Sequence, residues 1–598
     1  MKFSRLALAV VGLALGVSAR AAAPALAGAS SPFRREQAAS PVNWQTWDAT
    51  LPERAKKEGR PVYLFAGSFL NELSRATCRQ TFANADVAAY LNENFLCVIV
   101  DRDEQPDLAA AIQYYLHTIK QQDGWPASLW LTPELLPYEG AGYLPPSEEW
   151  GKPSFLKVAR QAREAWADPK AARTRAADAV AMMNTSPDLP PPATGPAPKR
   201  EAQLAEAAAA WRATYDAANA GFGQAPKSPE PELLRFLLAR PPEDRDPALA
   251  TLRAVINGAE RDPLDGGIFA RATDAAWKMP YFQKTLPDQA RVALACLDAA
   301  RVSGEPSFAQ AARGALDYSL ARLALPGGGF AAAEDDTTDE SASYYVWTAA
   351  EIDSVLGAES AAFKTAYAVQ PEGNVSADDD PSAHFKGKNI LRRATPVGDA
   401  ATEAVLASAI GRLRAARDHR PAPVRCDRAT AGAQGLMLAA LSRAGAQLAD
   451  PRFLNAAAQS FALLQKELLA SPEGDVRRMR GSDAPGGPAD YAALALGCRE
   501  FARTGKHPEA EVLATRLLAR ATTLFYDAAH GRFLAAPATL PPGLFVRAPA
   551  AGDPPSAEAL ALLAGAPGDQ AAALAKSLAA AIDGGIPTPG DVLLALGQ

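Results

Sequence analysis

The chain has 598 residues and a formal net charge of −6 at pH 7, from 61 basic and 67 acidic side chains. Charges of both signs are mixed along the chain, and no basic stripe marks a nucleic-acid partner, so we exclude nucleic-acid binding. At about 150 residues per domain, this length holds more than one core.

Residues 1–21 have the three-part build of a secretory signal peptide. Lys2 and Arg5 flank the start of an apolar stretch that runs from Leu6 to Val17, and small residues follow it. The stretch is shorter than the roughly 20 residues needed to cross a bilayer. We therefore expect export to the periplasm or the extracellular space, without a membrane span.

Residues 40–185 alternate strand and helix patterns. The apolar runs at 61–65, 95–100 and 129–131 predict strands, and residues 85–91 predict a helix. This order indicates a small α/β domain. Pro126 follows Trp125 immediately before the third predicted strand, where a thioredoxin fold places a cis-proline.

Residues 186–200 are rich in proline and predict a semi-rigid linker. Beyond it, residues 201–598 are nearly all helical, with apolar side chains repeating on one helix face. Glycine closes a helix and proline begins the next at three places, 304–306, 445–451 and 505–508. Recurring helical hairpins with Gly-aromatic loops predict a toroid.

Several motifs follow one another in a fixed order along most of the chain. They are Pro41-Val42-Asn43-Trp44, Gly124-Trp125-Pro126, Gly221-Phe222-Gly223-Gln224, Gly387-Lys388-Asn389-Ile390-Leu391 and Asp490-Tyr491-Ala492. In these stretches the chain resembles the YyaL-type, or spermatogenesis-associated thioredoxin-like, family. The resemblance implies a multidomain fold, with an α/β thioredoxin-like N-terminal domain followed by an all-α (α/α)6 six-hairpin toroid related to glycosidases and sugar epimerases.

The redox motif of that family is missing. Family members typically carry Cys-His-Trp-Cys after the first strand, where this chain has Asn71-Glu72-Leu73-Ser74. Dithiol exchange needs an attacking thiolate and a second, resolving thiol, so we expect no dithiol redox activity from Asn71 and Ser74. The remaining cysteines, Cys78, Cys97, Cys296, Cys426 and Cys498, include neither a C-x-x-C pair nor zinc-site spacing.

The toroid motifs have also lost the family's proton-transfer residues. The stretch 266–274 lacks the histidine found in the family. Tyr281 and Gln283 occupy the positions of a His and a Glu in the family. Sugar hydrolysis needs two facing carboxyl groups, and epimerisation needs an acid and a base of tuned pKa. The sequence therefore names no catalytic residue.

The polar residues that remain in these motifs are candidate ligand-binding residues: Arg271, Asp274, Trp277, Lys284, Asp288, Asp490 and Tyr491. Lys284 and Asp288 are expected to begin a helix four residues apart and to face a common mouth with the residues around 271–277. The alternative is that the set consists of salt bridges and loop anchors. The acidic run 334–340 is either a calcium site or, as we expect, a solvated loop.

Two functions stay open. The first is a non-redox binding or scaffolding protein of the cell envelope, whose toroid holds a carbohydrate or another polyol, or which contacts an envelope protein. The second is a carbohydrate-active enzyme, epimerase-like or glycosidase-like, that uses Asp274, Asp288 or Asp490. Histidines occur singly and no phosphate-cradling loop is present, so no metal and no cofactor are predicted.

Overall fold

The computed structural model describes residues 26–185, 200–336, 342–505, 507–550, 555–580 and 588–597. The predicted signal peptide, 1–21, and all but the last residue of the predicted linker, 186–200, lie outside these ranges. The chain divides into two compact units, Met1–Arg102 with Ile119–Ala181, and Asp103–Thr118 with Met182–Gln598. In the described ranges, no helix is long and apolar enough to cross a bilayer.

The first unit is built on a mixed sheet, whose described strands run in the order β1-β3-β2-β4-β5. These strands are β1 (Gln45–Thr46), β2 (Val62–Gly67), β3 (Leu96–Asp101), β4 (Ala127–Leu131) and β5 (Pro137–Ala141). β2 is parallel to β3 and antiparallel to β4, with Tyr63 opposite both Cys97 and Trp130. Every residue of β2, β3 and β4 is buried, as expected of strands covered on both faces.

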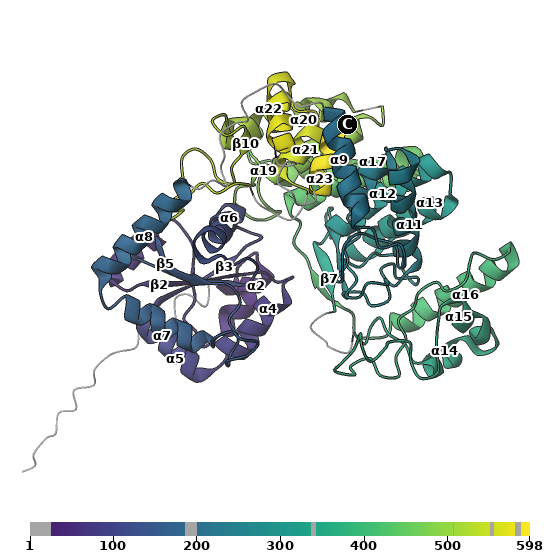
Figure 1. The fold of residues 1–598 in the computed structure, drawn as a ribbon, viewed down its shortest axis with the longest axis horizontal. Helices are drawn as coiled ribbons and strands as arrows, with labels where there is room; N and C mark the ends of the chain where they lie inside the picture. Colours follow the sequence, from purple (N-terminus) through teal and green to yellow (C-terminus); the bar gives the residue numbers. More distant parts are fainter. Residues whose placement is uncertain are drawn as a thin grey trace, which may run out of the picture. The chain divides into compact units, whose positions relative to one another are not determined.

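Helices surround this sheet (Figure 1): α2 (Pro32–Glu36), α3 (Leu51–Glu58), α4 (Glu72–Ala76), α5 (Ala85–Asn94), α7 (Phe155–Ala165) and α8 (Pro169–Asn184). Aromatic rings pack edge to face between sheet and helices, with centroids of Phe65 and Phe82 4.7 Å apart and of Phe82 and Phe155 5.4 Å apart. The predicted strands and the helix at 85–91 are confirmed. Their ends differ from the prediction by at most three residues.

In the second unit, twelve of the described helices form an inner and an outer ring, as their contacts show. Each inner helix contacts the next, and the last packs against the first: α10 (Pro231–Leu238), α12 (Leu286–Ser303), α17 (Ala431–Gln447), α19 (Pro488–Ala502), α21 (Ala557–Leu563) and α23 (Gly590–Gly597). The outer helices each contact an inner one: α9 (Arg200–Ala213), α11 (Pro242–Asn257), α13 (Pro306–Tyr318), α18 (Pro451–Leu463), α20 (Pro508–Phe525) and α22 (Gly568–Ala580). The predicted (α/α)6 toroid is therefore confirmed.

The inner helices are parallel. Hydrogen bonds join the first two turns of neighbouring inner helices or the residues just before them, as in Arg291 to Glu232, Gly432 to Asp490 and Ser556 to Asp591. The later turns are joined in the same way, by Arg235 to Asp298 and Arg443 to Glu500. We call the two faces of the ring the N-terminal mouth and the C-terminal end.

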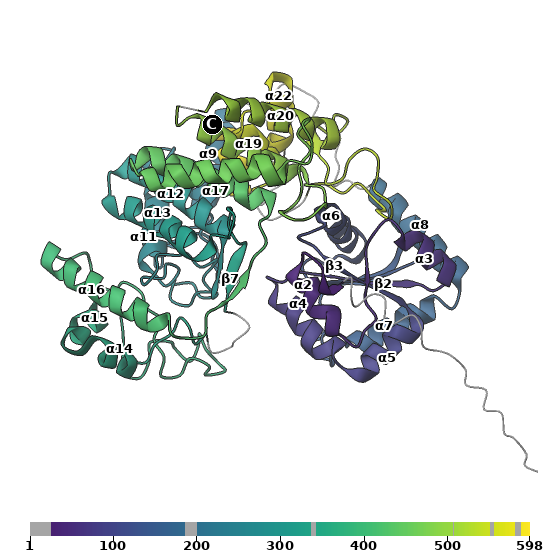
Figure 2. The ribbon, with the colours of Figure 1, turned by 180° about the vertical axis from the view of Figure 1, so that it is seen from behind.

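Two glycines allow α17 and α19 to meet backbone to backbone (Figure 2). A Cβ atom at Gly435 would lie 2.4 Å from the carbonyl carbon of Ala493, and one at Gly497 would lie 2.5 Å from the carbonyl oxygen of Gly435. Gly304 ends α12 with a φ of 73°, as predicted. Gly445 does not end its helix, because α17 continues to Gln447.

A segment between α13 and α17 adds strands and a helical lobe to the toroid (Figure 2). β7 (Ala333–Asp335) pairs antiparallel with β6 (Gln283–Thr285) and β8 (Val424–Cys426). α14 (Ala349–Leu356), α15 (Ser360–Ala366) and α16 (Ala400–Arg417) enclose a core of their own that includes Ile352, Phe363 and Leu413. The remaining described α-helix is α6 (Pro106–Tyr115), and the remaining strands are β9 (Tyr526–Asp527) and β10 (Arg532–Phe533), which form a hairpin.

Candidate functional site

Asn71 and Ser74, at the positions of the family's two cysteines, form the start of α4. The Asn71 Oδ1 atom accepts hydrogen bonds from the Ser74 backbone N–H and from the Ser74 hydroxyl, both at 2.8 Å. An asparagine that accepts from the third residue of a helix satisfies a backbone donor that would otherwise lack a partner. The two side chains thus cap the helix. The Trp125–Pro126 peptide bond is cis.

The chain's five cysteines all fall in the described ranges, where each is buried and none forms a disulfide. Burial raises the pKa of the Cys78, Cys97 and Cys498 thiols, and raises that of Cys296 to about 12. The thiolate is the reactive form, so these thiols are poor nucleophiles at neutral pH.

The residues around Trp277 anchor a loop. Asp274 is buried, and its Oδ1 atom accepts from the backbone N–H groups of Lys278 and Met279, both at 3.0 Å. Trp277 is 1 % exposed and donates its indole N–H to the carbonyl oxygen of Ala220 at 2.7 Å. The indole ring therefore offers no face to a ligand.

Lys284 lies in β6, before α12 begins, and is fully buried. Its Nζ atom is 2.8 Å from Asp262 Oδ2 and 2.8 Å from Asp265 Oδ1. Arg417 binds the same two carboxylates, at 2.6 and 2.8 Å. Burial would raise the pKa of Asp262, but the charges of Arg417 and Lys284 outweigh it and hold that pKa well below its usual range.

Aromatic rings close the space around the Lys284 ammonium. Its Nζ atom lies 4.8 Å from the ring centroid of Phe269 and 4.7 Å from those of Tyr318 and Tyr345. Each distance is within the range of a cation–π interaction. Lys284 is thus part of a paired, neutral and buried network. It lies in β6 and not in α12, so Lys284 and Asp288 do not begin one helix and do not face a common mouth as expected.

The other predicted residues lie in further, separate places. Arg271 is exposed and stacks over Tyr281, at 4.3 Å from the ring centroid. Asp490 is buried and accepts from the N–H groups of Gly432 at 2.8 Å and Gly487 at 2.9 Å. The hydroxyl oxygen of Tyr491 accepts from a backbone N–H, that of Val476, at 3.0 Å. The predicted set is therefore not gathered at one point.

The described inner helices share a feature that the motif comparison missed, an acidic residue in the first turn of every one except α17: Glu232, Asp288, Asp490, Glu558 and Asp591. Because these helices are parallel, their acidic side chains gather at the N-terminal mouth. Negative charge there is stabilised by the helix dipoles. The sequence shows each acid at a helix start, but only the closed ring shows that the starts meet.

Glu230 stands out among the mouth residues. It precedes α10 with a φ of 46°, a left-handed conformation that costs a non-glycine residue free energy. Burial raises its pKa against the opposing charge of Arg291, and the charges of Glu232 and Asp591 raise it further. Burial also acts on Glu232, but the bidentate contact with Arg291 outweighs it and lowers the pKa of that carboxyl. The pKa values of two neighbouring carboxyl groups are thus shifted in opposite directions.

Glu260 was also missed, and it lies near three of the predicted residues. It is fully buried, and neither carboxyl oxygen has a hydrogen-bond partner. Burial and the charges of Asp274 and Asp288 raise its pKa well above the usual range, while Arg271 opposes them. A single Glu in a loop is ordinarily exposed, so nothing in the sequence marks this residue.

The acidic run 334–340 is not a solvated loop where the structure describes it. Glu334 and Asp335 are buried in β7, and the hydroxyl of Tyr318 donates to Glu334 at 2.8 Å. The physical reason is that β7 pairs on both edges, with β6 and β8, which places its side chains inside. Residues 337–341 of the region lie outside the described ranges.

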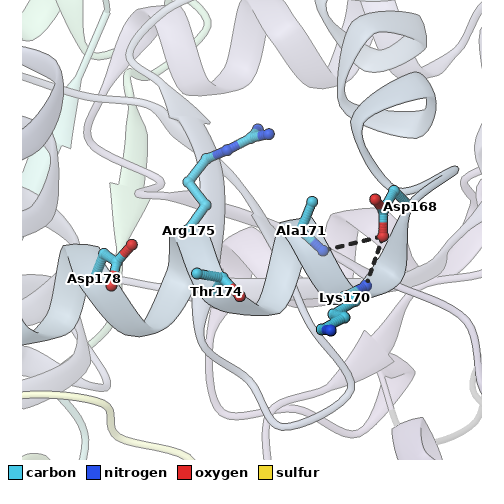
Figure 3. Close-up of a pocket in the computed structure, with 6 residues that line it drawn as sticks. All are labelled: Asp168, Lys170, Ala171, Thr174, Arg175 and Asp178. Atoms are coloured by element: carbon cyan, nitrogen blue, oxygen red, sulfur yellow. Dashed lines mark hydrogen bonds between the residues drawn. The ribbon is translucent and has the colours of Figure 1, made fainter.

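A shallow hollow along α8 carries no comparable chemistry. Figure 3 shows its lining, Asp168, Lys170, Ala171, Thr174, Arg175 and Asp178, all from α8 and the residue just before it. An Asp168 oxygen accepts from the backbone N–H groups of Lys170 and Ala171, both at 3.1 Å. This is the start of a helix, and the side chains do not converge on one point.

These observations define a class of protein, a thioredoxin-like domain joined to an (α/α)6 toroid. Residues 23–184 match the family model Thioredox_DsbH, described as a protein of unknown function, DUF255. The chain is 29 % identical over 572 residues to Spermatogenesis-associated protein 20 of Homo sapiens, covering 86 % of this chain and 72 % of the relative. The resemblance seen in the sequence is thus confirmed.

Solved structures with a similar arrangement include an unsaturated glucuronyl hydrolase from Bacillus sp. GL1, at 10 % identity and a TM-score of 0.31, covering 73 % of this chain and 89 % of that one. Another is an alpha-amylase from Clostridium perfringens, at 10 % identity and a TM-score of 0.37, covering 66 % and 95 %. The toroid is defined here by its own helix contacts.

Proposed function

We propose that the protein is exported, has a thioredoxin-like domain without dithiol redox activity, and binds a carbohydrate or another polyol at the N-terminal mouth of its toroid. The observation that carries the binding proposal is the partly exposed carboxylate of Asp288 at that mouth, with 21 % of its side chain exposed. The other first-turn acids, Glu232, Asp490, Glu558 and Asp591, are buried around it. Carboxylate oxygens accept hydrogen bonds from sugar hydroxyls. Burial raises the pKa of Glu230, which favours the carboxylic acid form that both donates and accepts them. Export rests on the signal-peptide pattern of residues 1–21.

The mature protein is expected not to reduce insulin disulfides, because Asn71 and Ser74 cap α4 and every thiol is buried. Reduction is measured as insulin turbidity with dithiothreitol and with a thioredoxin reductase as electron donors. The matched variant, Asn71→Cys with Ser74→Cys, places a thiol at the start of α4, where the helix terminus lowers a thiol pKa. Turnover by the natural chain above a no-protein control would contradict the proposal.

Binding at the mouth is expected to show as a rise in melting temperature with envelope polysaccharide fragments, because a ligand specific to the native state stabilises it. With a fragment so identified, Asp288→Asn is expected to weaken binding by about 1 to 3 kcal/mol, the cost of a lost hydrogen bond to a charged group.

The matched control for that variant is Asp246→Asn, on the outer helix α11, where the carboxylate is 69 % exposed. It removes the same charge far from the mouth and is expected to leave the affinity unchanged. Equal affinity in both variants, measured by calorimetry, would remove Asp288 from the site.

A second candidate function is carbohydrate hydrolysis, favoured by the raised pKa of Glu230 beside the ionised Glu232. In that reaction the Glu230 carboxyl would give its proton to the glycosidic oxygen as the carbon–oxygen bond breaks. Asp288 would take a proton from the water that attacks the sugar carbon. Reducing ends released from a glycan, and lost in Glu230→Gln with binding retained, would establish hydrolysis over binding alone.

A further inference from the structure

Trp150 is a large apolar residue on the surface of the first unit, where it is 75 % exposed. Tryptophan side chains are highly buried on average. Trp150 and Gly151 are the central residues of a two-residue turn between Glu149 and Lys152, which pair antiparallel. The backbone N–H of Lys152 donates to the carbonyl oxygen of Glu149 at 2.8 Å, and the reverse bond is 3.3 Å long. The turn therefore holds the backbone of Trp150 in a defined conformation.

The backbone conformation of this turn does not suit tryptophan. Trp150 has a φ of 51° and Gly151 a φ of 72°. Turns with two left-handed central residues favour Asn-Gly or Asp-Gly, because a bulky side chain is strained in that conformation. An exposed ring also adds little to a hydrophobic core. Folding alone therefore does not account for a tryptophan at this position, and strain of this kind clusters at ligand-binding sites.

The ring of Tyr143 lies beside that of Trp150. The ring centroids are 6.4 Å apart and the ring planes are 33° apart. Two faces that hold a flat ring between them must be separated by about 7 Å, twice the contact distance between carbon atoms. The two rings therefore leave no slot between them for a proline ring. They offer the exposed surface of Trp150, extended by Tyr143, which we call the aromatic platform.

Polar groups surround the aromatic platform. The Lys152 Nζ atom lies 5.8 Å from the ring centroid of Tyr143. Burial raises the pKa of Tyr143, and the nearby charge of Glu149 raises it further. The Ser147 hydroxyl donates to one oxygen of the Glu149 carboxylate. Among the described residues, the Trp150 indole N–H and the Tyr143 hydroxyl have no hydrogen-bond partner. Donors and acceptors are therefore left for a ligand around an apolar surface.

A protein surface and a membrane both fit the aromatic platform poorly. A tryptophan side chain buries about 250 Å² at most, whereas a stable protein interface takes about 800 Å² from each partner. Glu148 is paired with Lys157 at 2.7 Å, and the charges of Glu149 and Lys152 cancel. No net positive charge is left to attract an anionic lipid surface. The platform therefore fits a small unit with an apolar face and a polar rim.

We propose that the aromatic platform binds a pyranose ring of a polysaccharide, one whose hydroxyl groups are equatorial. Such a ring exposes C–H groups on its faces, and their partial positive charge is attracted to the negative face of an aromatic ring. Its hydroxyl groups lie at the rim, where they accept hydrogen bonds from Lys152 and donate them to Glu149. This site belongs to the first unit alone, and the inference does not depend on the site proposed at the mouth of the toroid.

The test is calorimetric titration of the full chain with cellohexaose, sorbitol and decaproline. Cellohexaose is expected to bind with a dissociation constant on the order of 1 mM, because one stacked ring supplies little free energy. Sorbitol is not expected to bind, since an open-chain polyol has no flat C–H face. Trp150→Asn is expected to weaken cellohexaose binding about tenfold or more. Its melting temperature should be unchanged or higher, because Asn-Gly suits this turn.

A second measurement locates the binding. The chain has nine tryptophans. With 5-fluorotryptophan in their place, the fluorine NMR signal that is missing in Trp150→Asn belongs to Trp150. That signal is expected to shift with cellohexaose, in the natural chain and equally in Asp288→Asn, which separates the platform from the mouth.

The control is Val512→Ala, which removes an exposed apolar side chain from α20 and is expected to leave the affinity for cellohexaose unchanged. Three results would each overturn the proposal. They are equal binding of cellohexaose by Trp150→Asn, a Trp150 signal that cellohexaose does not move, and tighter binding of decaproline than of cellohexaose at this signal. The last result would assign the platform to a proline-rich peptide.

Discussion

Glu260→Gln is expected to raise the free energy of unfolding at pH 7 by about 1 to 3 kcal/mol. Glu260 is buried with neither oxygen hydrogen-bonded, near the charges of Asp274 and Asp288. Burial and these charges raise the pKa of Glu260 and so favour its neutral form in the native state, which costs free energy as the pH rises above the usual glutamate pKa. Glutamine has almost the same shape and needs no proton to be neutral.

The pH dependence of stability determines whether Glu260→Gln stabilises or destabilises the protein. Below the usual pKa of a glutamate, 4.5, both folded and unfolded chains carry the proton on Glu260. As the pH rises above that value, the unfolded chain releases the proton and the folded chain keeps it, so the natural protein loses stability until the folded-state pKa is reached. The variant lacks this loss. Its advantage should be near zero at pH 4 and grow toward pH 7.

Urea unfolding at several pH values measures this difference, with Glu372→Gln as the control, because Glu372 is an exposed loop residue. The control is expected to change stability by less than about 0.5 kcal/mol at any pH. A Glu260→Gln protein that is less stable than the natural chain at pH 7 would show that the carboxyl has a partner the native state needs.

Lys284→Met is expected to destabilise the toroid by about 3 to 5 kcal/mol, the usual result of removing one partner from a buried ion pair. Asp262 and Asp265 would keep only Arg417 to balance two buried negative charges. Adding Asp265→Asn to Lys284→Met restores charge balance and is expected to recover part of the loss. Thermal and urea unfolding of the single and double variants measure both effects.

The exposed pair of Lys157 and Glu148 provides the control. Its atoms are 2.7 Å apart, and the side chains are 53 and 61 % exposed. Lys157→Met is expected to cost less than about 1 kcal/mol, because water screens an exposed pair. If Lys284→Met were as mild as this control, the network around Lys284 would not be the buried one described here.

Periodicity predicted the framework of the fold well, because burial acts on each segment locally. Apolar runs predicted the strands β2, β3 and β4. The positions of glycine and proline predicted the alternation of helices and turns. Gly445 shows the limit of such local rules. A Cβ atom there would lie 2.7 Å from Leu454 of α18, so the glycine serves a contact between helices rather than a helix end. Only the packed structure reveals that contact.

The candidate site was harder to predict, because side-chain roles depend on distant partners. Trp277 and Lys284 are polar or aromatic residues in a loop-rich stretch, yet their partners Ala220 and Arg417 are far away in sequence and bury them. Glu230 and Glu260 belong to no motif. The pKa of Glu230 depends on burial and on charged residues of neighbouring helices in the ring, and that of Glu260 depends on burial and nearby charges. Asp490 and Tyr491 follow the alternative considered from the sequence, in which they anchor loops.

The contact that closes the ring has a consequence for how the chain acquires its structure. α23, at the end of the described chain, packs on α10, where a Cβ atom at Gly590 would lie 2.5 Å from the Leu233 nitrogen. Trp211 also donates its indole N–H to the carbonyl oxygen of Thr588 at 2.6 Å, across 377 positions of sequence. Contacts of such long range form slowly, since a large loop must close first. The contacts between α23 and α10 are therefore expected to be among the last to form as the ring closes.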